Sequence, residues 1–377
     1  MRTTTTTTAA AVLVAGVCAT LVAGPAHAAG PAPSCGDTLT QDTVLAADLT
    51  CAEGDGLVLA PGVTLDLGGH ALTGHGRSAG SGVVAPAQGV VTVTNGVVRG
   101  WHRGITAHED PGSPSPEGLG GTLYVDRVVV EDTTYGIRAR GRVDGQHKRV
   151  VVDRSTIRGD GNGTGILVHH GTVDTRRSTV QRHAVGIQAG ESRVTLSRSV
   201  VRDNGTGAAT EQTRLEITSS SLVGNRFGVY TSYADDLFVS HSEMLHNGRG
   251  LFLAASDGTA RVQDTTFARN DVGIDQTGNL ALVRRVTFRE NGTGYRVAAG
   301  TWAGPWQQMS EVVDSTFTDG GDGLVSAQDG LRVGGNGASG NSGRGIHAPG
   351  ATDLGGNTAS GNGTEPQCVG VSCTPGG

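Results

Sequence analysis

The chain has 377 residues, of which 62 are glycine and only 4% are aromatic, and its formal net charge at pH 7 is −6. All 29 of its lysine and arginine residues except Lys148 are arginine, and they are spread along the chain. Because nucleic-acid binding needs a clustered basic surface, this distribution argues against a nucleic-acid partner. Short alternating runs such as VVTVTNGVV recur, and no apolar stripe at helical spacing continues beyond about two turns. The composition and the patterning therefore predict an all-β chain.

The first predicted element is a secretory signal peptide over residues 1–28. Arg2 precedes a run of threonines, the apolar stretch AAAVLVAGVCATLVAG follows, and Ala26-His27-Ala28 has the small residues of a cleavage site. The apolar stretch is short and contains glycine, which argues against a transmembrane anchor. No later segment is apolar enough to span a bilayer. We therefore expect a secreted mature chain without a membrane span.

A repeat occupies most of the remaining chain. A glycine followed by an apolar residue recurs from Gly104 to Gly345, mostly at intervals of 21 to 23 residues. Each repeat reads as a strand, a polar turn and a second strand, without a helix. Since so short a unit cannot bury its apolar face alone, it has to stack on its neighbours. The interval predicts a solenoid with coils of about 21–23 residues.

An asparagine lies three residues before the repeat glycine in several repeats. These asparagines are Asn162, Asn204, Asn225, Asn247, Asn270 and Asn291. In stacked coils the amides would lie above one another, where each can hydrogen-bond to the coils on both sides. Asn-Gly-Thr at residues 204–206 also matches a glycosylation acceptor, but the asparagine recurs at positions 225 and 247 where no Ser or Thr follows. The recurrence favours a buried ladder.

The repeat resembles that of a known family. Together with GVTLDLGGHALTG at residues 62–74 and CGDTLTQDTVLAADLTC at residues 35–51, it is similar to the secreted right-handed parallel β-helix repeat proteins of the pectate-lyase-like superfamily. The resemblance implies a single-stranded right-handed parallel β-helix, with a cap and first coils in residues 29–75, the helix proper over residues 76–363 and a tail over residues 364–377. This superfamily includes polysaccharide lyases, hydrolases, epimerases, phage tailspikes and adhesins, so the fold does not assign the activity.

Four cysteines follow the signal peptide, and an even number in an exported chain is typical of disulfides. Four cysteines allow three pairings, but coils about 4.8 Å apart would form a rod on the order of 50 Å long. A disulfide between the first and the last coil is then impossible. We therefore predict the local bridges Cys35–Cys51 and Cys368–Cys373, each closing one end of the solenoid.

The strand that follows each repeat glycine carries the candidate site. Side chains alternate along a strand, so stacked coils present two outward columns, in which successive residues are about 5 Å apart. In the first coils these columns bring basic and titratable groups together. The predicted catalytic residues are His108, Arg138, Arg140 and His169, and the predicted substrate-binding residues beside them are Asp110 and His170.

Extra residues in three repeats agree with this location. They fall in EDPGSPSPEGLGG and GRVDGQHKR, which flank the same strands, and in AAGTWAGPWQQMS. Trp302 and Trp306 in the last of these offer flat apolar faces with a polar indole donor, which suits sugar rings. Two alternatives stay open: the arginines could form ordinary surface ion pairs with Glu109 or Glu131, and the tryptophans could cover the coil beneath them.

Cofactor sites have little support in the sequence. No Cys and His spacing resembles a zinc site, and the glycines follow the coil period instead of preceding a helix, which argues against a phosphate-binding loop. Acidic residues on adjacent coils could bind calcium. No other cofactor is indicated, and the oligomeric state is not predicted.

Two functions are therefore considered. The first is an extracellular enzyme acting on polysaccharide, a uronan lyase or epimerase, in which arginine neutralises the sugar carboxylate and histidine moves a proton. The second is a non-catalytic β-helix that binds glycan or coats a surface. The first predicts titratable groups clustered between the long loops, and the second predicts a flat, sparsely charged face.

Overall fold

The computed structural model describes residues 32–107, 121–141, 148–233, 236–254, 258–278, 280–299 and 309–375. The predicted signal peptide lies outside these residues, as do His108, Asp110, Trp302 and Trp306. The described residues form strands and no helix, so none of them makes an apolar helix of membrane-spanning length.

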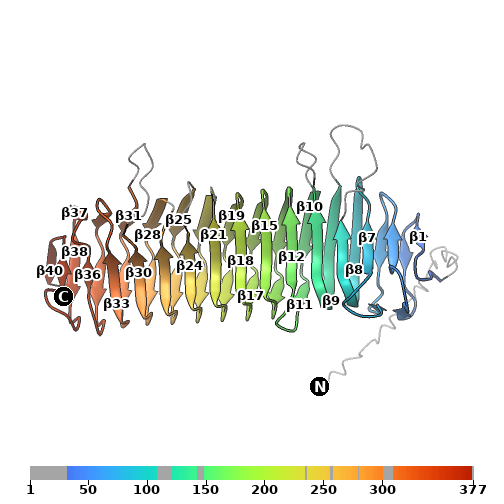
Figure 1. The fold of residues 1–377 in the computed structure, drawn as a ribbon, viewed down its shortest axis with the longest axis horizontal. Coiled ribbons are helices and arrows are strands. Elements are labelled where there is room, and N and C mark those ends of the chain that lie inside the picture. Colours follow the sequence, from blue (N-terminus) through green and yellow to red (C-terminus); the bar gives the residue numbers. More distant parts are fainter. Residues whose placement is uncertain are drawn as a thin grey trace, which may run out of the picture. The chain divides into compact units, whose positions relative to one another are not determined.

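All 40 strands are joined in one parallel arrangement, drawn in Figure 1. The first are β1 (Thr38–Leu39), β2 (Thr43–Val44), β3 (Leu49–Thr50), β4 (Leu57–Leu59), β5 (Thr64–Asp66), β6 (Ala71–Thr73), β7 (Ser81–Ala85), β8 (Val90–Ala107) and β9 (Thr122–Arg140). The central ones are β10 (Lys148–Asp153), β11 (Thr156–Arg158), β12 (Thr164–His169), β13 (Gly171–Arg176), β14 (Thr179–Gln181), β15 (Val185–Gly190), β16 (Arg193–Ser197), β17 (Val200–Arg202), β18 (Thr206–Glu211), β19 (Arg214–Thr218), β20 (Ser221–Val223), β21 (Phe227–Ser232), β22 (Asp236–Ser240), β23 (Glu243–Leu245), β24 (Arg249–Leu253), β25 (Thr259–Gln263), β26 (Thr266–Ala268), β27 (Val272–Gln276), β28 (Leu280–Arg284), β29 (Thr287–Arg289) and β30 (Thr293–Val297). The last are β31 (Glu311–Val313), β32 (Thr316–Thr318), β33 (Asp322–Ser326), β34 (Arg332–Gly334), β35 (Gly337–Ser339), β36 (Ile346–His347), β37 (Thr352–Gly355), β38 (Asn357–Ser360), β39 (Cys368–Val369) and β40 (Cys373–Pro375).

Most coils of the solenoid have three strands, whereas β8 and β9 each run along all three sides of a coil as one continuous strand. In the central coils β12 pairs with β15, β13 with β16 and β14 with β17, always in parallel. The same relation continues along the chain, so the three sides of the coils build three parallel sheets of a right-handed β-helix. The predicted fold class is confirmed, and the predicted handedness is the one expected of crossovers between parallel strands.

The sequence pattern predicted two strands in each repeat. The structure corrects this prediction, because the central coils contain a third strand. In SRVTLSRSVV, strands β16 and β17 are separated by a tight turn around Arg198, whose φ is +51°. Because one residue in the left-handed region turns the chain sharply, the apolar alternation appears continuous across two strands. The sequence pattern therefore merges two sides of a coil into one.

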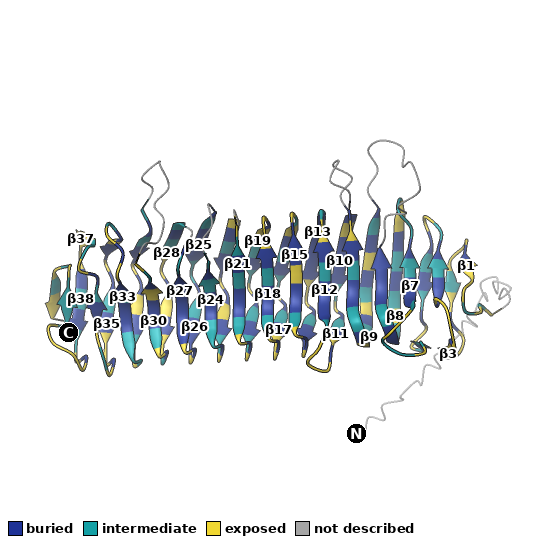
Figure 2. Cartoon of the chain, in the orientation of Figure 1, coloured by how far each residue is buried: buried dark blue, intermediate teal, exposed yellow. Residues whose placement is uncertain are grey.

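Apolar side chains fill the interior of the solenoid. Figure 2 shows how buried and exposed residues are distributed along the strands. Phe267, Phe288 and Phe317 stack in consecutive coils, with ring centroids 5.2 and 4.7 Å apart. On the outside, Tyr230 and Phe252 of adjacent coils are in contact, with centroids 5.4 Å apart. Aromatic pairs of this kind support neighbouring strands of a sheet.

The asparagine ladder is present from Asn204 to Asn291, and all five of these asparagines are buried. The Nδ2 group of Asn225 donates to Oδ1 of Asn247 over 3.1 Å, and the backbone N–H of Asn225 donates to the same oxygen over 2.9 Å. Asn247 repeats both bonds to Asn270. Each amide oxygen thus binds the coil before it, so the ladder ties adjacent turns together.

Asn162 does not belong to this ladder, contrary to the sequence prediction. Its backbone N–H donates to Oδ1 of Asp160 over 3.1 Å, in a widened turn. The next coil presents His183 at the ladder position, and the backbone N–H of His183 donates to Oδ1 of Asn204 over 2.9 Å. The ladder therefore ends at a buried imidazole.

Both predicted disulfides are present, Cys35–Cys51 at one end of the solenoid and Cys368–Cys373 at the other. The tail of residues 364–377 contributes strands to the helix: β39 pairs with β36, and β40 pairs with β38. The two bridges therefore lie in the first and last coils, where stacking is one-sided.

Candidate functional site

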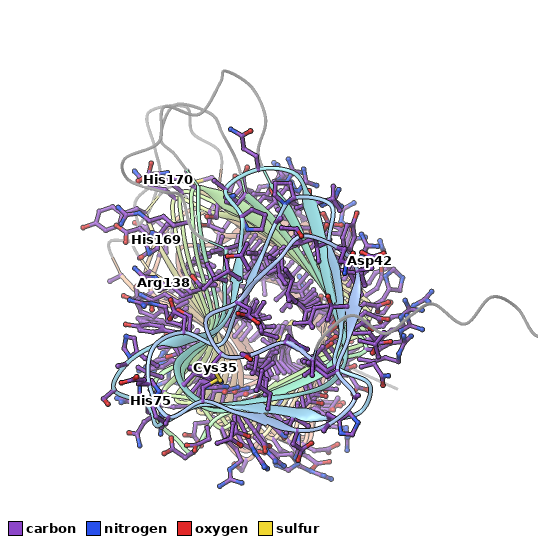
Figure 3. The ribbon with its side chains drawn as sticks, turned by 90° about the vertical axis from the view of Figure 1, so that its right-hand side faces the viewer. Cys35, Asp42, His75, Arg138, His169 and His170 are labelled. Carbon is purple, nitrogen blue, oxygen red and sulfur yellow. A yellow bond between two sulfur atoms is a disulfide. The ribbon has the colours of Figure 1, made fainter. Side chains whose placement is uncertain are left out.

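The predicted outward columns lie in register. Arg138 of β9 pairs with Leu167 of β12, and Arg140 pairs with His169. Together with Ala139 and His170, these residues line a hollow of about 210 Å³. Figure 3 shows Arg138, His169 and His170 on the same side of the solenoid. Three of the four predicted catalytic residues and one predicted substrate-binding residue are thus brought together.

The other predicted members of the site cannot be placed in this way. His108, Asp110, Trp302 and Trp306 lie outside the described residues. The described residue that precedes the first two, Ala107, pairs with Ala139 between the two arginines.

Arg138 and Arg140 make no ion pair with any carboxylate that the structure describes. Glu131, considered above as their partner, instead forms an ion pair with Arg158. Arg138 is half-buried and its guanidinium lies 5.7 Å from the centroid of the Tyr135 ring. Burial lowers the pKa of Arg138, and the neighbouring Arg103 lowers it further. Since the ordinary pKa of arginine lies far above neutrality, the group remains charged at neutral pH. The hollow thus presents two cations to an anionic ligand.

His169 is held mainly in its neutral form. Partial burial lowers its pKa below the ordinary value of 6.5, and His170, Arg140 and Arg138 add to the effect. Glu191 opposes it. A neutral imidazole next to two cations can accept a proton from a group that the cations have made more acidic.

His170 forms the turn that follows β12. Its φ is +49°, and its Nδ1 lies 3.5 Å from Oε2 of Glu191 in the next coil. The imidazole lines the hollow of Arg138 and His169 on one side and contacts Glu191 on the other.

Sequence reasoning missed two neighbours of Arg138. Tyr135 lies against Arg138, and its ring meets that of His102 edge to face with centroids 5.4 Å apart. Arg103 pairs with Tyr135 in register. Both residues directly precede a repeat glycine, so a third column, read one position before each glycine, would have found them.

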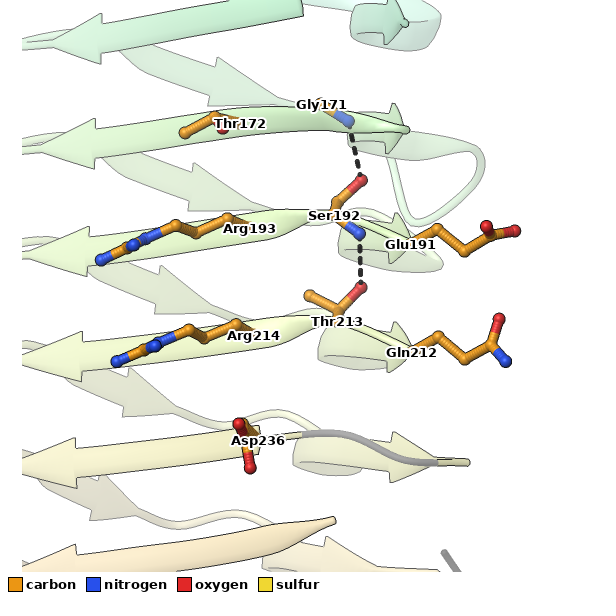
Figure 4. A pocket seen from close by; sticks show the side chains of 9 residues that line it. All are labelled: Gly171, Thr172, Glu191, Ser192, Arg193, Gln212, Thr213, Arg214 and Asp236. Carbon is orange, nitrogen blue, oxygen red and sulfur yellow. Dashed lines mark hydrogen bonds between the residues drawn. The ribbon is translucent and has the colours of Figure 1, made fainter. Parts of the chain in front are cut away.

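A second hollow, of about 690 Å³, is drawn in Figure 4. It lies next to the first, because His170 lines one hollow and Gly171 lines the other. It was not predicted from the sequence. Its lining residues are Gly171, Thr172, Glu191, Ser192, Arg193, Gln212, Thr213, Arg214 and Asp236. Most of its lining residues carry polar side chains, and it crosses several coils.

Among the described residues no group of three or more His, Cys, Asp or Glu side chains is arranged to hold a metal ion.

Comparison with known proteins agrees with the fold. Residues 164–304 match the family model described as "Right handed beta helix region", and the coils continue on both sides of the matched segment. No curated protein is similar to the chain in sequence.

Solved structures with similar folds include three of different kinds. An alginate lyase from Paenibacillus sp. is 16% identical, with 68% of this chain and 92% of that chain covered and a TM-score of 0.41. The A-module of a mannuronan C-5 epimerase from Azotobacter vinelandii is 14% identical, with 91% and 92% covered and a TM-score of 0.35. A protein of Geobacillus virus E2 is 10% identical, with 75% and 54% covered and a TM-score of 0.42.

Proposed function

We propose that this right-handed parallel β-helix protein acts on an acidic polysaccharide outside the cytoplasm, as a uronan lyase or epimerase. The observation that carries the proposal is one hollow that contains two arginines without described carboxylate partners and an imidazole whose pKa is lowered. The two disulfides support an exported protein, because such bonds persist in oxidising compartments.

The proposed chemistry follows from the charges. Arg138 and Arg140 bind the carboxylate of a uronate and so stabilise the negative charge that develops when the proton leaves the adjacent α-carbon. Neutral His169 accepts that proton. In a lyase the electron pair of the broken C–H bond forms a carbon–carbon double bond, the glycosidic C–O bond breaks, and the leaving oxygen takes up a proton. In an epimerase a proton returns to the same carbon from the opposite face.

The test uses the mature protein and purified polyuronates, with and without added calcium. We expect wild-type protein either to generate unsaturated chain ends, measured by ultraviolet absorbance, or to change the epimer ratio, measured by NMR. Arg140→Ala and His169→Ala should abolish the change and leave the melting temperature unaltered. The matched controls Arg182→Ala and His241→Ala remove the same kinds of side chain from exposed turns elsewhere, and they should retain it.

The alternative is a non-catalytic glycan-binding β-helix. Its support is the uncharged column of Leu167, Gln188 and Ala209, which continues from Arg138 along the same face. If wild-type protein binds the polymer but changes neither chain ends nor epimer ratio, the enzyme proposal is rejected in favour of binding.

A further inference from the structure

We infer that the larger hollow is a second binding subsite for the same acidic polysaccharide, and that the polymer runs along the solenoid axis across the coils of β13, β16, β19 and β22. The inference rests on the proposed function, because it extends the path of that ligand. It assigns to the chain a binding surface that lies on a different sheet from Arg138 and His169.

The hollow has the form of a trough along the axis. Thr172, Arg193, Arg214 and Asp236 lie in register in four successive coils. Figure 4 shows the side chains of Arg193 and Arg214 extended in parallel on one side, and those of Glu191 and Gln212 on the other. Successive coils are about 4.8 Å apart. A linear polymer lying between the two rows would therefore meet Glu191 and Arg193 in one coil and Gln212 and Arg214 in the next.

One wall of the trough is cationic. Arg193 is 53% exposed, and among the described residues its ion pair is with Glu216, at 3.7 Å. Arg214 is exposed and makes no ion pair with a described residue. Because exposed arginines form bidentate contacts with carboxylates, this wall suits the acidic edge of a uronan chain.

The opposite wall suits the hydroxyl edge of the same polysaccharide. Gln212 offers both a donor and acceptors. Glu191, whose carboxylate lies 3.5 Å from His170, accepts hydrogen bonds from hydroxyl groups, and its negative charge keeps the uronate carboxylates on the side of the arginines. Asp236 instead lies in the arginine row, in register with Arg214. Its negative charge repels a carboxylate bound to that row, so we place the end of the subsite there.

The floor of the trough consists of small residues that hydrogen bonds hold in place. The backbone N–H of Gly171 donates to Oγ of Ser192 over 3.2 Å, and the N–H of Ser192 donates to Oγ1 of Thr213 over 3.4 Å. Both hydroxyls also donate to backbone carbonyls two residues earlier in the chain. Small side chains that are already ordered leave room for a sugar ring and lose little entropy when it binds.

The trough is continuous with the candidate site. His170 lines the smaller hollow, and its partner Glu191 lines the trough. The boundary between the two hollows is therefore a single turn residue. A polysaccharide held by Arg138 and Arg140 can pass over this turn and reach Arg193.

The experiment is a titration of wild-type protein and variants with oligouronates of two lengths, a disaccharide and a chain long enough to reach the trough. Arg193→Ala/Arg214→Ala should weaken binding of the long oligomer about tenfold, the ratio expected from losing two modest charge-assisted contacts. Binding of the disaccharide should change less than about twofold. The matched control is Arg182→Ala/Arg198→Ala, which removes two arginines that form no ion pair with a described residue.

Three outcomes separate the inference from the function on which it rests. A loss confined to the long oligomer and to the trough variant supports the subsite. Equal affinity of the trough and control variants for the long oligomer overturns the subsite and leaves the proposed function intact. If wild-type protein binds no polyuronate of either length, the proposed function and the subsite are both rejected.

Discussion

The imidazole of His169 lies over Gly190 of the next coil, so closely that a Cβ on Gly190 would be 2.7 Å from Nδ1 and 2.9 Å from Cε1 of the ring. The two residues pair in register between β12 and β15. The backbone of Gly190 lies outside the positive-φ region that favours glycine. The glycine is therefore needed for the space it leaves, which the His169 ring occupies.

We predict that Gly190→Ala moves the His169 ring and leaves the fold intact. The new methyl group would meet only the ring of the partly exposed His169 side chain, which can rotate away. The NMR resonances of His169 should shift, and conversion of polyuronate should fall, while the melting temperature stays close to that of wild type. Gly337→Ala, where a Cβ would make ordinary contacts no shorter than 3.4 Å, serves as the control. Unchanged His169 resonances would contradict the prediction.

The pH dependence of His169 should follow from its neighbours. Its pKa is lowered by burial first, and then by His170 and Arg140. Because a lowered pKa keeps the base neutral, activity that needs neutral His169 should persist as the pH falls to 6.5 and be lost only at lower pH.

Arg140→Gln tests this assignment without relying on activity. Removing the positive charge raises the pKa of His169, so the NMR titration of its ring should move to higher pH, and the acid limb of any activity profile should move with it. Arg182→Gln should leave the titration unchanged. A downward shift in Arg140→Gln would show that Arg140 does not act on His169 through its charge.

The fold could be predicted from the sequence because the solenoid repeats one local solution many times. The glycine interval determines the coil length, and strand alternation then places Arg138, Arg140 and His169 on one outer surface. The third strand was missed because turns such as that at Arg198 do not interrupt the apolar alternation. Asn162 was misassigned because spacing from the glycine does not show that Asp160 has widened the turn.

The trough could not be predicted for a related reason. It lies where the ends of two sheets meet across one-residue turns, at His170, Glu191 and Gln212, whose φ values are between +47° and +49°. The relative direction of the two sheets depends on those backbone angles. The alternation of side chains along one strand contains no information about the direction of the adjoining sheet. The sequence pattern therefore did not single out Arg193 and Arg214.

The ladder makes a prediction about stability. Asn247→Ala removes the amide that accepts two hydrogen bonds from Asn225 and donates one to Asn270. Buried partners are left unsatisfied, so the free energy of unfolding should fall by about 1 to 3 kcal/mol. Asn162→Ala should lower the free energy of unfolding less, because the hydrogen bond to Asp160 is made by the backbone N–H of residue 162, which the substitution keeps. Thermal unfolding followed by circular dichroism compares the two, and equal losses of melting temperature would argue against the ladder.

The buried side chain of His183 should make the folded protein less stable in acid. It is 1% exposed, and neither ring nitrogen makes a hydrogen bond of good geometry with a described residue. The backbone groups of Ile157 and Asn162 lie close enough to raise its pKa, but burial outweighs them. Burial lowers its pKa from 6.5 to about 4. Between these two values the unfolded chain binds a proton that the folded chain does not, so stability falls as the pH decreases from 6.5 to about 4. The full loss is about 3 kcal/mol at 1.36 kcal/mol for each pKa unit.

His183→Asn should reduce this pH dependence. Asparagine occupies the same ladder position in the following coils, where Asn204 donates through Nδ2 to Asn225 over 3.0 Å, and an amide does not titrate. Carboxyl groups whose pKa is lowered in the folded chain, such as that of Asp264, change the stability mainly below the unfolded value of 3.8. The titration of His169 changes the stability of wild type and variant equally. The difference between wild type and variant, measured by urea unfolding from pH 7 to pH 4.5, therefore isolates His183. His241→Asn, at an exposed turn, should retain the wild-type slope, and a slope that is unchanged in His183→Asn would show that His183 is not the titrating group.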